Sequence, residues 1–258
     1  MAGFLGFGNY AKPGKGVKKD GPKKKRFFLF FEIYFRKFWK LVQLNLLYVL
    51  FCIPIITIGP ATAAMTKIIH SFTMEKPVFL FSDFWDAFKA NFKQGLVVGI
   101  LDLVLSFCIT QAWIFYYAKT LESGLYWVLL GIVIIFTLLF AFANYYVYLI
   151  ICTVDLKLLP ILRNSFLLSF LGVRTNFITL FFAGGLTVLV FLFCPIFVSL
   201  LLALFIFFST YTMITAFNSF QYIHKYMIHP YYFQNGLPDP YEPQEELDEA
   251  DRVFEDAT

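Results

Sequence analysis

Long apolar runs separated by short polar segments set the pattern of this chain. A helix that spans a membrane needs about 20 apolar residues. Four runs reach that length, at residues 38 to 58, 96 to 118, 125 to 151 and 176 to 217. The last would form a helix of roughly 63 Å, too long for a hydrocarbon core of about 30 Å. We expect Cys194-Pro195 to divide it into helices over 176 to 194 and 196 to 217, with Gly184-Gly185 a weaker break. The pattern predicts an all-α polytopic membrane protein.

The first apolar run ends at IGPATA, and a semi-apolar stretch around Lys67 follows. Gly59 suits the C-terminal cap of a helix, and Pro60 suits the first position of the next helix. We therefore expect a hairpin at Gly59 and Pro60 and a returning helix over residues 60 to 74. That helix would be about 22 Å long, which is shorter than the hydrocarbon core. We expect it to be a sheltered or re-entrant helix.

The positions of the cations support this return. If residues 59 to 95 formed an external loop, five spans would leave seven cations on the outer side. With the return, the connectors 75 to 95 and 152 to 175 lie in the cytoplasm and Lys119 is the one loop cation outside. Because cytoplasmic loops carry an excess of lysine and arginine, the return is favoured. The prediction is six membrane-embedded helices in three hairpins, the second helix short, with both termini in the cytoplasm.

Three segments have the pattern of amphipathic helices that lie in the membrane interface. They cover residues 23 to 40, 82 to 94 and 158 to 170. Aromatic residues near the ends of the apolar runs indicate two interfacial belts. One contains Trp113 and Trp127 with neighbouring tyrosines, and the other contains Tyr145, Tyr146 and Tyr148. We take residues 38 to 217 as the transmembrane domain.

Composition and charge agree with a membrane protein. The chain is 59% hydrophobic and 15% charged, with a mean hydropathy of +0.71. Eleven of its 21 lysines and arginines lie in residues 1 to 40, and nine of its 17 acidic residues lie in residues 239 to 256. We interpret residues 1 to 37 as a basic cytoplasmic segment that contacts the lipid bilayer, and we expect no nucleic-acid binding. Residues 218 to 258 are predicted to be an acidic, disordered cytoplasmic tail.

Two ionisable residues fall inside the predicted helices. A charge at the bilayer centre costs about 2.5 to 3.5 kcal/mol on insertion scales, so Lys67 and Asp102 are candidate functional residues. A salt bridge between them, or a Lys67 side chain that reaches the interface, would be a structural role; a substrate or proton site would be a functional one. Asn45 and Asn144 are expected to form interhelical hydrogen bonds. Gly95 and Gly99 have the spacing of a helix-packing motif.

No catalytic motif is present in the sequence. The chain has no phosphate-binding glycine loop, no nucleophile elbow and no zinc-protease motif. Its three histidines, His70, His224 and His229, have no carboxylate or thiolate partners at metal-ligand spacing. The four cysteines lie in or beside apolar runs and have no paired spacing. We therefore expect no enzyme activity, no metal and no cofactor.

Four segments of the sequence are distinctive: GFGNY (6 to 10), KKKRFFLFFEIYFRKFWKLVQLNLLY (23 to 48), IPIITIGPATAAM (53 to 65) and DFWDAFKANFKQ (83 to 94). Together they resemble the YesL family of bacterial membrane proteins, whose members have no established activity. The resemblance implies a protein of the bacterial plasma membrane with an accessory role in carbohydrate uptake, partnered by the permease of an ABC transporter. The sequence also leaves open whether the protein forms a homo-oligomer. The alternative is a small secondary transporter or channel that uses Asp102 and Lys67.

Overall fold

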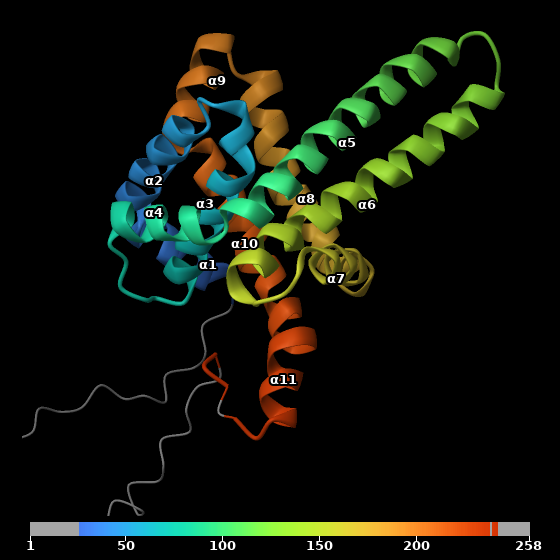
Figure 1. The fold of residues 1–258 in the computed structure, drawn as a ribbon. Helices are drawn as coiled ribbons and strands as arrows, with labels where there is room; N and C mark the ends of the chain where they lie inside the picture. Colours follow the sequence, from blue (N-terminus) through green and yellow to red (C-terminus); the bar gives the residue numbers. More distant parts are fainter. Residues whose placement is uncertain (1–25, 238, 242–258) are drawn as a thin grey trace, which may run out of the picture. The chain divides into compact units, whose positions relative to one another are not determined.

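The computed structural model describes residues 26–237 and 239–241, and over these residues the chain is built of helices without strands (Figure 1). The α-helices are α1 (Arg26–Arg36), α2 (Phe38–Phe51), α3 (Ile58–Thr73), α4 (Leu80–Ala90), α5 (Phe92–Lys119), α6 (Leu125–Thr153), α7 (Leu158–Leu171), α8 (Val173–Val188), α9 (Ile196–Leu202), α10 (Phe208–Ile223) and α11 (His229–Gln234). A 3₁₀ turn, η1 (Ile55–Thr57), precedes α3. Three π-helical turns are η2 (Leu189–Phe193), η3 (Ala203–Phe207) and η4 (His224–Ile228).

The chain divides into two units, residues 1–36 and 37–258. Helix α1 belongs to the first, and its aromatic side chains contact one another at helical spacing. The rings of Phe27, Phe31 and Phe35 follow each other at centroid distances of 4.9 and 6.2 Å. Ile33 is buried, whereas Phe28 and Phe35 are exposed. Helix α1 ends at Arg36 and α2 begins at Phe38, so the amphipathic helix expected over residues 23 to 40 is interrupted at Lys37.

The first predicted span is shorter than the sequence pattern indicated. Helix α2 ends at Phe51 instead of residue 58. Pro54 explains the difference, because proline has no N–H for the helical ladder and its ring collides with the carbonyl of the preceding turn. The Thr57 hydroxyl donates to the Phe51 carbonyl oxygen at 2.5 Å and closes the turn. The chain therefore reverses over residues 52–57.

The predicted hairpin at Gly59 and Pro60 is correspondingly displaced. Both residues lie in the first turn of α3 and both are buried. Pro60 is tolerated there because the first-turn N–H groups have no helical partner. Most residues of α3 are buried, and it packs against α4, α5, α6 and α10. The returning helix is thus sheltered by protein on most sides.

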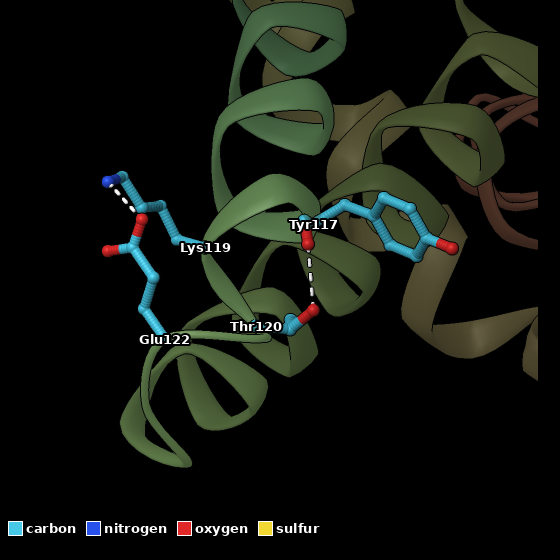
Figure 2. A network of polar contacts seen from close by, with 4 residues as sticks. All are labelled: Tyr117, Lys119, Thr120 and Glu122. Carbon is cyan, nitrogen blue, oxygen red and sulfur yellow. Dashed lines mark hydrogen bonds and ion pairs between the residues drawn. The ribbon is translucent and has the colours of Figure 1, made fainter.

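Helices α5 and α6 run side by side as a long antiparallel hairpin (Figure 1). They agree closely with the spans predicted at 96 to 118 and 125 to 151. At the tip, Lys119 Nζ pairs with Glu122 Oε1 at 2.6 Å, and the Thr120 hydroxyl donates to the Tyr117 carbonyl at 2.7 Å (Figure 2). These local contacts close the connection between the helices.

Four helical stretches of the described chain are long and apolar enough to cross a membrane. They are Phe92–Lys119, Leu125–Thr153, Val173–Phe193 and Ile196–Gln234. The last two are separated at Cys194 and Pro195, where the sequence predicts a break. Helix α2 is too short for a full span, and so is α3, which corresponds to the predicted second helix. The helix lengths therefore do not support six complete spans.

The last helical stretch extends beyond its predicted end. It continues through η4 and α11 to Gln234, so residues 218–234 are helical and not part of a disordered tail. Buried Phe220, Ile223 and Ile228 give this part an apolar face. The acidic residues that suggested disorder begin only at Asp239, and residues 242–258 lie outside the described residues. The same is true of the basic residues 1–25.

Two connectors form helices, as their patterns predict. Helix α4 corresponds to the expected 82 to 94 segment and α7 to 158 to 170. Helix α4 buries Phe84 and Phe88, whose rings lie 5.2 and 5.1 Å from the ring of Phe51. Phe81 in its first turn and Phe79 just before it are exposed. Helix α7 packs on α6.

Candidate functional site

Helices α3, α5, α6 and α10 enclose a cavity of about 440 Å³. Its wall is rich in hydroxyl groups, which come from Thr62, Thr66, Ser106, Thr110, Thr137, Tyr145, Tyr148, Tyr211, Thr212 and Thr215. Ile109, Phe140 and Leu149 add apolar surface. Of the described residues that line it, Asp102 is the one with a carboxylate. Two long apolar helices, α5 and α6, therefore meet α3 and α10 around a space that carries hydroxyl groups and one carboxylate.

Asp102 is held by two neighbours from α6. The Tyr148 hydroxyl donates to Asp102 Oδ2 at 2.6 Å. With its amide turned to place the NH₂ group toward the carboxyl, Asn144 donates to the same oxygen at 3.0 Å. Asn144 and Tyr148 are four residues apart, so both lie on one face of α6. The structure thus brings together two predicted polar residues, Asp102 and Asn144, across the α5–α6 hairpin.

Sequence reasoning missed the role of Tyr148. Tyr145, Tyr146 and Tyr148 were interpreted as an interfacial belt, but Tyr146 is fully buried and donates to Asn176 Oδ1 at 2.7 Å. Tyr145 and Tyr148 both line the cavity. Spacing along the hairpin does not identify this pair, because Asp102 lies 17 residues from the connected end of α5 and Tyr148 lies 23 residues from that of α6.

Lys67 lies elsewhere. Its Nζ donates to the carbonyl oxygen of Cys152 at 2.7 Å. Cys152 is in the last turn of α6, where carbonyl groups have no helical partner and a cation is favoured by the helix dipole. No ion pair among the described residues joins Lys67 to Asp102. Lys67 therefore caps the C-terminal end of α6 and does not line the cavity, whereas Asp102 does.

Asn45 secures the irregular last helix. Its Nδ2 donates to the carbonyl oxygens of Ala203 and Leu204 at 2.8 and 2.7 Å, and its Oδ1 accepts from Ser209 N at 2.9 Å. These groups lie in or next to the π-helical turn η3, where the regular ladder is interrupted. Asn45 thus links α2 to α10, as an interhelical hydrogen-bonding residue would.

Three glycines allow α3 and α5 to cross in direct contact. A Cβ built on Gly59 would overlap the carbonyl oxygen of Gly95 and lie 2.8 Å from Gly99 Cα. A Cβ on Gly95 would lie 2.9 Å from Pro60 Cα. The small-residue spacing of Gly95 and Gly99 therefore meets Gly59 and Pro60, which act in packing instead of forming the hairpin turn. This crossing holds α3 beside the cavity.

Side chains of the cavity wall can form hydrogen bonds with a bound solute. Hydroxyl groups can both donate and accept, and the Asp102 carboxylate can accept from an ammonium or a hydroxyl group. Within the described part of the chain, no cluster of three or more His, Cys, Asp or Glu residues could hold a metal ion. The absence of enzyme activity and of a cofactor stays a prediction.

The four helical stretches that are long and apolar enough to cross a membrane place the chain in the class of α-helical membrane proteins. The sequence model of one family, described as "Protein of unknown function, DUF624", matches residues 41–113. This match runs from α2 into α5 and is consistent with the YesL-type resemblance. Comparisons with curated proteins and with solved structures found no match.

Proposed function

We propose that this protein is a small secondary transporter or channel whose cavity binds a small hydrophilic solute, with Asp102 as its anchor. The observation that carries the proposal is the position of Asp102, which faces a hydroxyl-lined cavity in the apolar α5–α6 hairpin. An ionisable group at such depth is costly unless it is paired, so it is rarely present without a role.

The hydrogen bonds that Asp102 forms within the protein use only part of its acceptor capacity. Its two protein donors, Tyr148 and Asn144, hold one of its carboxylate oxygens most closely. A carboxylate has about four acceptor positions, so acceptor capacity is left for a bound solute. The chemistry of the wall fits a cation or a polyhydroxylated molecule. Aromatic rings at Tyr145 and Tyr211 supply flat apolar surface beside the hydroxyls.

Flux measurements in reconstituted vesicles test this proposal. Candidate solutes are monovalent cations, small amines and monosaccharides, each supplied with and without a proton gradient. Asp102→Asn keeps the shape of the side chain but removes its charge, and we expect it to abolish flux of the transported solute. The matched control is Asp86→Asn, because Asp86 is an exposed carboxylate that pairs with Lys89 on α4. Flux that survives Asp102→Asn unchanged would exclude Asp102 as the anchor.

The accessory role in carbohydrate uptake remains a second proposal, supported by the YesL-type resemblance and by the family match over residues 41–113. Under this proposal a permease would dock on two exposed aromatic residues, Phe79 just before α4 and Phe81 in its first turn. Purification in mild detergent tests it. A stoichiometric permease that is lost with Phe81→Ser, but kept with Glu122→Gln at the hairpin tip, would support it. Isolation as a free monomer or homodimer would count against it.

A further inference from the structure

The two ends of the cavity differ in access. Ser106 and Thr110 on α5 are exposed, so the wall is open where these residues lie. Thr66 and Ala216 at the other end are 4% and 3% exposed. A solute that enters past Ser106 therefore meets a closed end between α3 and α10.

One helical turn beyond that end, about 6 Å along each axis, lies a pair of rings. His70 follows Thr66 on α3, Phe220 follows Ala216 on α10, and their ring centroids are 4.3 Å apart. His70 is 4% exposed, and neither of its ring nitrogens has a hydrogen-bond partner among the described residues. Buried polar groups are normally hydrogen-bonded. The His70 ring is therefore expected to form a hydrogen bond with water or solute that enters from the neighbouring cavity.

Residues 239–241, here called the strap, cover this pair. Tyr241 lies 5.1 Å from the Phe220 ring and 5.8 Å from the His70 ring. Asp239 holds the strap in place, because its Oδ2 pairs with His224 Nε2 at 2.8 Å and its Oδ1 accepts from Tyr241 N at 2.9 Å. Asp239 is 4% exposed although it lies close to the end of the described chain.

Two helix ends bring the strap into position. After α11, Leu237 N donates to Tyr232 O, Gly236 N donates to Phe233 O, and Gly236 has a φ of 62°. This Schellman turn reverses the chain toward α10. After α3, Lys76 N donates to Ser71 O in a turn of the same kind, and Lys76 Nζ lies 5.3 Å from the Tyr241 ring centroid. Burial raises the pKa of Tyr241, so its ring stays neutral beneath the ammonium.

We infer that His70, Phe220 and the strap form a gate that closes the Asp102 cavity toward the ends of α3 and α10. This inference rests on the proposed binding of a solute in the cavity. When the strap moves away, the His70 nitrogens become available to water or to the hydroxyl groups of the solute. The three parts come from separate segments, and the Asp239–His224 pair fastens the strap. The strap can therefore leave without separation of α3 from α10.

Thiol labelling tests the gate without any knowledge of the solute. A single reporter, Thr66→Cys, is placed in a cysteine-free background, since it changes the size of the side chain little. A small charged methanethiosulfonate is applied to vesicles with the C-terminal side outward. We expect slow labelling in the parent and labelling at least tenfold faster with Tyr241→Ala or Asp239→Asn. Tyr231→Ala, an exposed tyrosine on the neighbouring α11, is the matched control and leaves the rate unchanged.

A second reporter and a second variant locate the effect. Thr110→Cys at the open end, labelled in vesicles of the opposite orientation so that the reagent reaches that end directly, should react at the same rate with or without the strap. His70→Phe makes the inner ring pair apolar, so it should slow labelling of Thr66→Cys again when combined with Tyr241→Ala. Equal labelling of Thr66→Cys in the parent and in both strap variants would overturn the gate. Faster labelling without measurable flux would keep the gate and count against transport, whereas unchanged labelling with Asp102-dependent flux would do the reverse.

Discussion

The inner and outer halves of the α5–α6 hairpin have similar apolar sequences but different surroundings. The inner half packs against α3 and α10 and carries Asp102, Asn144 and Tyr148. The outer half exposes Phe107, Phe115 and many aliphatic side chains, and it ends in the Lys119–Glu122 pair. Hydrophobicity therefore places both halves in a membrane, but polar and small residues decide which half assembles with other helices.

The glycines show the same difference. Gly95 and Gly99 on the inner half contact Gly59, whereas a Cβ on Gly131 of the outer half would meet nothing within 4 Å. In lipid, close packing has to replace the hydrophobic attraction that joins helices in water. Glycine is therefore required where α3 crosses α5 and is replaceable near the tip.

The largest effect is expected at this crossing. Gly59→Ala places a methyl group against the Gly95 carbonyl, so α3 and α5 must separate, and overpacking of this kind costs about 1 to 3 kcal/mol. Thermal unfolding in detergent micelles measures the loss. The control is Gly131→Ala, which adds the same methyl group in open space and should stabilise α6 by up to about 1 kcal/mol. Equal effects at both positions would remove the distinction between the halves.

An effect of comparable size is expected from the polar link between α6 and α8. Asn176 accepts from Tyr146 and donates to Ser169 O at 2.9 Å, and all of these groups are buried. Asn176→Leu leaves both partners unsatisfied, which costs about 1 to 3 kcal/mol. The matched change in the outer half is Thr137→Val, which removes the acceptor of Trp113 Nε1. Hydrogen bonds between membrane helices average about 0.6 kcal/mol, so its effect should be clearly smaller.

The smallest effect is expected at the hairpin tip. Lys119→Ala breaks the pair with Glu122, but both side chains are exposed, and exposed pairs contribute little to stability. We expect no measurable change in unfolding temperature and no change in flux. A clear loss of folded protein would mean that the tip contacts a partner or anchors the hairpin in the membrane.

The long helices could be predicted because their apolar runs exceed what a soluble fold would carry. The ends of α5 and α6 and the break at Cys194-Pro195 follow from hydrophobicity and proline alone. The Gly59-Pro60 pair predicts the first hairpin too late in the chain, because Pro54 already ends the helix before it. Glycine has two uses, turn and close contact, and sequence alone does not separate them when the contacting helix lies 36 residues further on.

The candidate site was only partly predictable. The burial cost of a charge singles out Asp102 and Lys67 in the sequence, but it does not say which neighbours they meet. Lys67 is long and reaches a free helix end, whereas Asp102 is short and depends on Tyr148 and Asn144. The threonines of α3 and α10 that complete the cavity carry no signal in sequence, because an isolated threonine bonds to its own helix as readily as it lines a space.

The central claim is that the space around Asp102 is a hydrated binding cavity and not a dry seam between helices. Single cysteines at positions 106, 107 and 110 of α5, in a cysteine-free background in lipid vesicles, test it most directly with a small charged thiol reagent. Ser106 and Thr110 line the cavity, whereas Phe107 is 65% exposed and is absent from the wall. We predict labelling of Ser106→Cys and Thr110→Cys, protected by a bound solute, and no labelling of Phe107→Cys. No labelling at any of the three positions, or equal labelling at all three, would contradict the account.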